Sequence, residues 1–238
     1  MEVYARLSTA GSNTDGTTKF ESDIVPLSSR GLHLIIEGIF LALFTGVWTG
    51  MRLWCRRMKK VPISIEDWLH LTALFFFYGQ VVTCFISVSM GGAGHHVNEL
   101  QPWHIVRFYK AIFAIQVLYA LGVGFVKISI TVMLMRIFVT RRVRIAGSFI
   151  IFISALWIVL TILVGLLLCK PIQQNWNMNA GGTCGNQYAG FGVVAAVDIF
   201  NEICLLILPI PSVLNLHIHN RYKVALAGVF GTGIMSVT

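Results

Sequence analysis

The segment ALGVGFVKISITVMLMRIF, residues 120–138, decides the fold of this chain. This segment closes a long apolar run from Val106 to Phe138. Within residues 120–138, Lys127 is the only charged residue before Arg136. About 20 consecutive apolar residues are enough for a helix to cross roughly 30 Å of hydrocarbon, and this run exceeds that length. The segment therefore predicts a transmembrane helix that carries a charge within the bilayer.

The same pattern recurs along most of the chain, with further apolar runs at residues 33–55, 68–90, 143–168 and 188–214. Only 12% of the residues are charged and 56% are hydrophobic, whereas about 25% of an ordinary soluble domain is charged. A last run, residues 224–238, would be only about 22 Å long as a helix. We predict an all-α polytopic transmembrane bundle with five full spans and a partial sixth, and we expect the chain to be truncated there.

Charge distribution predicts how the bundle is oriented. The net charge is +8, and eleven of the eighteen basic residues lie in or beside the connections that follow odd-numbered spans: Arg52, Arg56, Arg57, Lys59, Lys60, Arg136, Arg141, Arg142, Arg144, Arg221 and Lys223. Cytoplasmic loops carry such an excess, so we expect a plasma-membrane protein with an external N-terminus. Residues 1–32, rich in Ser, Thr and Gly, then form a flexible external tail. Basic clusters of this kind favour anionic lipid heads as partners and argue against nucleic acid.

This orientation separates the five cysteines. Cys169 ends the fourth span and Cys184 lies in the next connection, so both are external, where oxidation is allowed. We predict a disulfide between them, worth about 3 kcal/mol in the loop-entropy model. Cys55, Cys84 and Cys204 are expected to be small apolar residues that are buried or face lipid.

Lys127 is the most informative polar residue within a span. It lies nine residues before Arg136, about 13 Å from the cytoplasmic end of its helix. A charge at this depth costs at least about 2.5 to 3.5 kcal/mol unless it finds water or a partner, so it should face the bundle interior.

The fifth span offers partners for this lysine. Asp198 and Glu202 lie four residues apart on one helix face, with Asn201 beside them. Glu202 lies about 18 Å from the helix end near Leu214, so depth favours Glu202 over Asp198 as the partner of Lys127. Three roles remain open for such a pair: a structural ion pair, a ligand or switch site, and part of a proton or ion pathway.

Other polar residues have weaker indications of function. Glu37 in the first span is a secondary candidate near its outer third. Ser64 is expected to cap the second span, with Glu66 and Asp67 in the first turn, where carboxylates stabilise the helix dipole. Pro209 and Pro211 should kink the fifth span.

Neither a metal site nor an active site is predicted. The loop GGAGHHVNELQPWH, residues 91–104, contains His95, His96 and His104, but Glu99 is its only carboxylate and it has no thiol. Adjacent histidines rarely bind one metal ion, so we predict neither metal nor cofactor. The sequence also lacks the HExxH and GxSxG patterns and a paired histidine box, which argues against an enzyme.

Five motifs, in this order and spacing, resemble those of the fungal rhodopsin-domain family of seven-span membrane proteins. They are IEDWLHLTAL at 65–74, GGAGHH at 91–96, FVKISITVMLMRIF at 125–138, LCKPIQQNW at 168–176 with Cys184, and NEICLLILPIPSVLNL at 201–216. The family pattern usually has Asp where this chain has Glu202, which preserves the charge. The resemblance implies a receptor-like fold that senses an unknown external chemical ligand, with a cytoplasmic signalling partner.

The resemblance does not imply retinal binding. Retinal proteins attach their cofactor to a lysine in the last span, whereas Lys127 lies in the third, and MRIF replaces the acidic-Arg-aromatic triplet of animal receptors. A membrane transporter, or a structural membrane protein with no signalling activity, remains the alternative. A transporter is expected to show broken helices in matching positions of two repeats, and only the proline break of the fifth span is visible.

Overall fold

A computed structural model describes residues 25–26, 28–60, 62, 64–96, 99–138, 140–176 and 181–209. Five long helices make up most of these residues: α2 (Ser29–Met58), α3 (Ile65–Ser89), α4 (Pro102–Ile137), α5 (Arg141–Leu167) and α6 (Gln187–Ile207). Each is long and apolar enough to cross a membrane. The structure thus confirms an all-α polytopic bundle.

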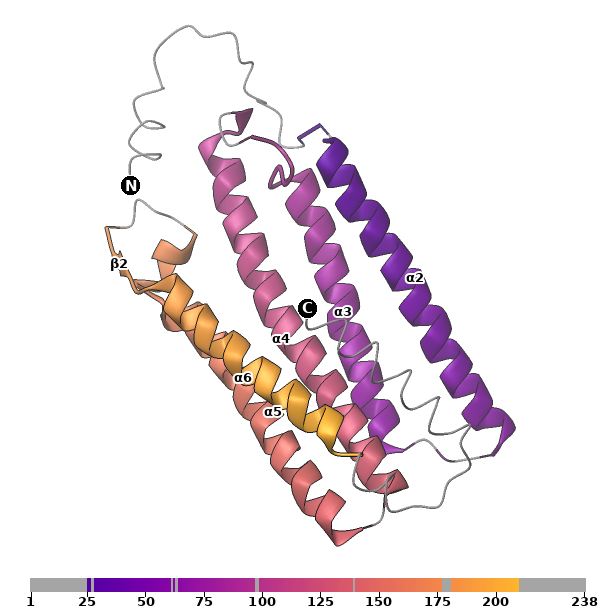
Figure 1. Cartoon of the computed structure of the whole chain (residues 1–238). Helices are drawn as coiled ribbons and strands as arrows, with labels where there is room; N and C mark the ends of the chain where they lie inside the picture. The colour runs from indigo at the N-terminus through magenta and orange to yellow at the C-terminus, as the bar shows by residue number, and fades with distance from the viewer. Residues whose placement is uncertain are drawn as a thin grey trace, which may run out of the picture.

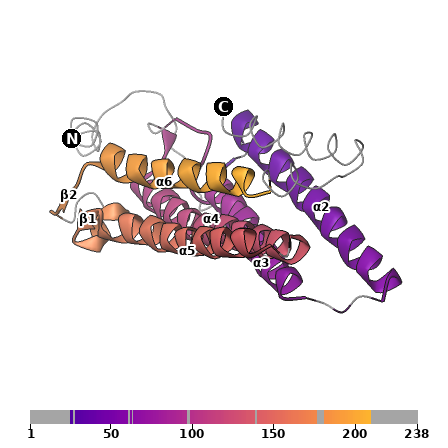
Figure 2. The ribbon, with the colours of Figure 1, turned by 60° about the horizontal axis from the view of Figure 1, so that its bottom comes forward.

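The helices run alternately up and down, and α4 lies in the middle of the bundle (Figure 1). Helix α4 packs against α3 on one side and α5 on the other, α6 packs against α5, and α2 packs against α3. The view in Figure 2 shows α2 at one side of the bundle and α5 and α6 at the other. Helices α3 and α4 therefore lie between α2 on one side and α5 and α6 on the other.

Small residues let the central helices approach closely. A Cβ atom at Gly124 of α4 would overlap the side chain of Ile158 of α5. Ala120, one turn earlier on α4, is fully buried. Glycine and alanine at such contacts are the usual means of helix packing in membranes, where lipid tails are as apolar as leucine.

Large apolar side chains cover the outside of the bundle. Phe40 and Leu43 of α2 are each 66% exposed, and Phe75 of α3 is 74% exposed. A surface of this kind is stable in hydrocarbon and would aggregate in water. The exposure pattern thus agrees with a lipid bilayer as the surroundings of the described helices.

The described helices begin one to four residues before the predicted spans, and α6 ends seven residues before the predicted end of the fifth span. Helix α2 begins at Ser29, four residues before the expected start of the first span. Helix α6 ends at Ile207, two residues before Pro209, instead of continuing to Leu214. The expected tail up to residue 24, the predicted kink at Pro211 and the partial span at 224–238 lie outside the described residues.

The disulfide between Cys169 and Cys184 is present in the structure, as predicted. It joins two short antiparallel strands, β1 (Cys169–Lys170) and β2 (Thr183–Cys184), whose register pairs Cys169 with Cys184. The short 3₁₀ helix η2 (Ile172–Asn175) follows β1. The amide of Asn175 donates a hydrogen bond to the Gly165 carbonyl at 3.2 Å, which holds this connection against the end of α5.

At the same end of the bundle, the residues before α2 pack over the ends of α3 and α4. The Val25 amide donates to the Ser89 carbonyl at 3.0 Å, and the Val25 side chain packs with Leu100 and Ile105. His95 contacts Glu99 at 3.2 Å through Nδ1 and the Pro26 carbonyl at 2.7 Å through Nε2. The described part of the expected tail is therefore held against the bundle.

Candidate functional site

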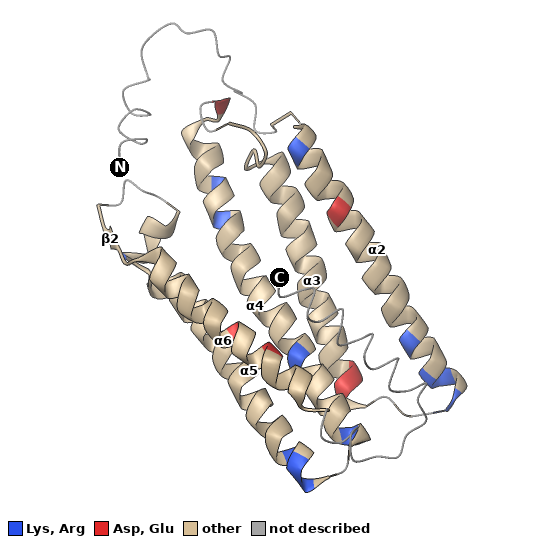
Figure 3. Cartoon of the chain, viewed as in Figure 1, with Lys and Arg blue, Asp and Glu red and all other residues tan. Residues whose placement is uncertain are grey.

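Basic residues gather at the opposite end of the bundle (Figure 3). We call this the basic end; it holds the C-terminus of α2, the N-terminus of α3, the C-terminus of α4 and the N-terminus of α5, with basic residues at 56–60, 136 and 141–144. It is the end that charge distribution predicts to be cytoplasmic. Two buried carboxylates lie among these cations.

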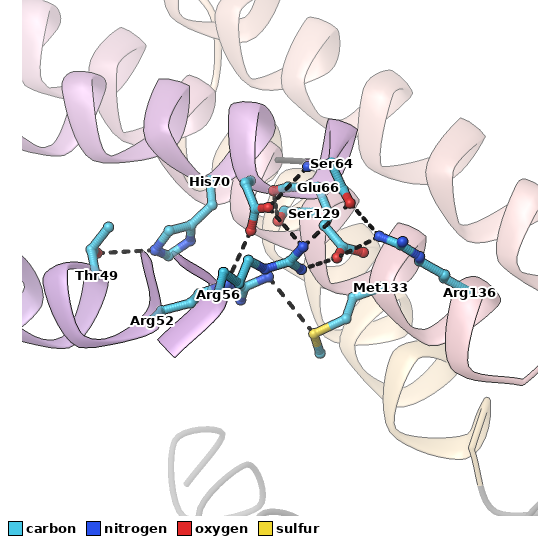
Figure 4. Close-up of polar contacts among 10 residues, drawn as sticks. Thr49, Arg52, Arg56, Ser64, Glu66, His70, Ser129, Met133 and Arg136 are labelled. Carbon is cyan, nitrogen blue, oxygen red and sulfur yellow. Dashed lines mark hydrogen bonds and ion pairs between the residues drawn. The ribbon is translucent and has the colours of Figure 1, made fainter. Parts of the chain in front are cut away.

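The two carboxylates bind three arginines from two other helices (Figure 4). Glu66 and Asp67, in the first turn of α3, are 3% and 1% exposed. Asp67 contacts Arg52 at 3.3 Å and Arg56 at 3.0 Å, both from α2. Glu66 pairs with Arg56 and, at 3.3 Å, with Arg136 of α4. We call these five residues the arginine–carboxylate cluster.

Ser64 links this cluster to the start of α3. It is the N-cap residue, as predicted, and its backbone N–H donates to the Asp67 carboxylate at 3.1 Å. Its hydroxyl accepts from Arg56 at 3.3 Å and also from Arg136. The hydroxyl of Ser129 on α4 donates to the Glu66 carbonyl at 2.8 Å. One helix start therefore ties α2, α3 and α4 together.

Sequence reasoning did not predict this cluster. It assigned Glu66 and Asp67 to the helix dipole and the arginines to topology, and both roles are compatible with the structure. The sequence did contain a signal for this cluster: two carboxylates in a membrane span lie at the same side of the membrane as several arginines. Buried charges are costly when unpaired, so these carboxylates need cationic partners.

A second charged centre lies within the bundle, where α4 faces α6. Lys127 is 5% exposed. Its Nζ donates a hydrogen bond to Asp198 Oδ1 and lies 3.5 Å from Glu202 Oε1. We call these three residues the Lys127 centre. The expected contact with Glu202 is present, but Asp198, one turn away, is the closer partner.

Aromatic and polar side chains of α5 support the Lys127 centre. The Nζ of Lys127 lies 5.1 Å from the ring centre of Trp157, within range of a cation–π interaction. The indole N–H of Trp157 donates to the Val194 carbonyl of α6 at 3.2 Å. The buried Asn201 donates its amide to Ser154 Oγ at 2.8 Å. Asn201 therefore joins α6 to α5 rather than contacting Lys127 directly.

A cavity of about 570 Å³ adjoins this centre. Its walls come from α2, α3, α4 and α6, and its lining includes Lys127 and Glu202 but not Asp198. The lining is mostly apolar. Its polar part includes His70 of α3, whose Nε2 lies 3.1 Å from Thr49 Oγ1 of α2. A pocket of this size, apolar with a few convergent polar groups, has the form of a small-molecule site.

The remaining candidates lie elsewhere. Glu37 is exposed on α2 and does not line the cavity. His104 is buried at the start of α4, whereas His95 contacts Glu99 at the end of the bundle that holds the disulfide. Among the described residues, no three His, Cys, Asp or Glu side chains come together as metal ligands could.

Five helices that can cross a membrane, with charged residues in the interior of the bundle, define a polytopic integral membrane protein. Residues 51–238 match the model of the fungal rhodopsin domain, so the chain belongs to the fungal rhodopsin domain family. This confirms the resemblance drawn from the sequence motifs.

Three fungal relatives are similar to most of this chain. The polyenoic acids biosynthesis gene cluster protein Ba17b of Metarhizium anisopliae is 27% identical over 81% of the chain and 54% of its own length. An SAT4 family membrane protein of Emericella nidulans is 26% identical over 63% of the chain and 40% of its own length. Receptor GIN3 of Arthrobotrys oligospora is 27% identical over 80% of the chain and 46% of its own length.

The chain thus spans about half the length of the curated relatives that it matches. No solved structure matches it significantly.

Proposed function

We propose that this protein is a receptor-like protein of the plasma membrane that senses an external chemical cue, with its N-terminus external and its basic end cytoplasmic. The observation that carries the proposal is the cavity of about 570 Å³ beside the Lys127 centre. An apolar cavity with charges at its wall can bind a small molecule and respond to it, because a bound ligand changes the balance of a buried ion pair.

Two further observations support this function. The described helices form a membrane bundle of the fungal rhodopsin family, and one relative is named a receptor. The arginine–carboxylate cluster joins three helices at the basic end, where a cytoplasmic signalling partner would bind. The proposal includes no retinal, because retinal proteins attach their cofactor to a lysine in the last span, whereas Lys127 lies in the third span and is paired with Asp198.

Replacement of the gene in its own host tests the proposal. We expect a set of transcripts that respond to an external small molecule in the wild type, and that no longer respond in a null strain. The strain with Glu37→Gln, a change outside the cavity, should keep the response. A transcript set that is the same in null and wild type under every cue would contradict a sensory role.

A transporter predicts a different result. Purified protein in liposomes would then move the cue across the bilayer, and the null strain would differ in uptake. Flux that depends on the protein, without a transcriptional response, would replace the receptor proposal with the transporter alternative.

A further inference from the structure

The Lys127 centre contains more acidic than basic side chains. One ammonium group faces two carboxylates, those of Asp198 and Glu202. In the part of the chain that the structure describes, no other Lys or Arg forms an ion pair with either carboxylate. An ionised carboxylate at this depth is stabilised by a cationic partner, and Asp198 and Glu202 share Lys127, so a second cation beside Glu202 would be stabilised there.

The two carboxylates differ in their position relative to the cavity. Asp198 receives the hydrogen bond of Lys127 and is not part of the cavity lining. Glu202 lines the cavity, its side chain is 34% exposed, and its nearest carboxylate oxygen is 3.5 Å from Lys127. The Glu202 carboxylate can therefore accept a hydrogen bond from a group inside the cavity.

The other walls of the cavity suit an apolar and aromatic body. Phe44 and Trp48 of α2 and Phe77 of α3 contribute aromatic rings to the lining. Aromatic faces attract cations as well as apolar groups. A ligand with one ammonium group and an apolar body would satisfy both the carboxylate and these walls.

We propose that the cavity binds a monocationic amphiphile, a hydrophobic amine whose ammonium group pairs with Glu202 while its apolar body lies against the aromatic walls of α2 and α3. This inference deepens the proposed receptor function and rests on it. An anionic ligand fits less well, because the two carboxylates beside Lys127 repel a third negative charge. The cavity volume of about 570 Å³ lies within the usual range for small-molecule sites.

Three probes with the same body and different head groups test the proposal: phenylbutylamine, phenylbutanol and phenylbutanoic acid. Binding to the purified full chain is measured in nanodiscs of uncharged, zwitterionic lipid, so that the amine does not accumulate on an anionic surface. We expect the amine to bind roughly tenfold tighter than the alcohol, equivalent to about 1.4 kcal/mol. The acid should bind more weakly than the alcohol.

Variants of two glutamates test whether the preference for the amine depends on Glu202. Glu202→Gln should bring the affinities for amine and alcohol to within about twofold of each other while the alcohol still binds. The matched change Glu37→Gln, on the exposed side of α2, should leave the tenfold preference intact. If Glu202→Gln fails to fold, Glu202→Asp, which keeps the charge, should fold and retain the preference for the amine.

Equal affinities for amine and alcohol in the wild type would overturn the proposal, as would an amine preference that survives Glu202→Gln. Absence of binding by all three probes would also overturn it, since the cavity would then be occupied by lipid or by another part of the protein. An amine preference without a transcriptional response would reject the receptor function and keep the site. A response without an amine preference would reject only this ligand class.

Discussion

Lys127 of α4 donates its hydrogen bond to Asp198 of α6, although depth along the fifth span favours Glu202 as its partner. The helix ends explain the difference. Lys127 lies nine residues before Arg136, and Asp198 lies nine residues before Ile207, where α6 ends. Depth counted from Ile207 instead of Leu214 places Asp198, about 13 Å from the helix end, level with Lys127.

This geometry predicts unequal coupling in double-mutant cycles. Lys127→Met should lower stability by up to about 3 to 5 kcal/mol, because it leaves two carboxylates without their cation. Asp198→Asn should lower stability less, because Lys127 keeps Glu202 as a partner at 3.5 Å. The double variant should recover much of the loss caused by Lys127→Met. The cycle of Lys127→Met with Glu202→Gln should show weaker coupling, and unfolding followed by fluorescence in detergent measures both.

Glu37→Gln serves as a control for the loss of a carboxylate within a span and should change stability little. Stronger coupling of Lys127 to Glu202 than to Asp198 would contradict the hydrogen-bonding pattern described above. Additive losses in both cycles would show that Lys127 meets neither carboxylate.

The arginine–carboxylate cluster predicts different roles for two arginines. Arg56→Gln should lower stability by about 3 to 5 kcal/mol, because it removes a partner of both buried carboxylates. Arg136→Gln should cost at most about 1 kcal/mol, because the Arg136 side chain is 54% exposed. Thermal unfolding of the two variants checks this order, and equal losses would show that Arg56 does not bridge the carboxylates.

The disulfide prediction can be tested chemically. Mass spectrometry of non-reduced peptides should find Cys169 linked to Cys184 in protein made through the secretory pathway. Cys169→Ser should destabilise the fold by about 2 to 4 kcal/mol. Cys84→Ser, at a cysteine that is free in the structure, is the matched control. Alkylation of both Cys169 and Cys184 in the folded protein would contradict the pairing.

Orientation in the membrane stays a prediction from charge, and glycosylation mapping measures it. An acceptor site inserted before Val25 should be glycosylated, because the external side faces the lumen during synthesis. An acceptor site inserted beside Arg141, at the basic end, should stay unmodified. The reverse pattern would place the basic end outside and remove the basis for a cytoplasmic partner there.

Much of the fold follows from the sequence because hydrophobicity and length determine spans in a bilayer. The cap at Ser64, the disulfide and the interior position of Lys127 were predictable from local pattern, topology and the cost of a buried charge. Contacts between helices were not. Periodicity does not give the relative rotation of two helices, so neither the pairing of Arg56 with Glu66 nor the cation–π contact of Lys127 with Trp157 was predictable from the sequence.

The central claim is that the Lys127 centre is part of a sensory site and not only a structural ion pair. The response of a strain that carries Lys127→Met together with Asp198→Asn tests it most directly, provided that folded protein at the cell surface matches the wild type. We predict that this strain loses the cue-dependent transcripts although the protein is present and folded. A full transcriptional response in the double variant would contradict the claim and leave the pair a purely structural role.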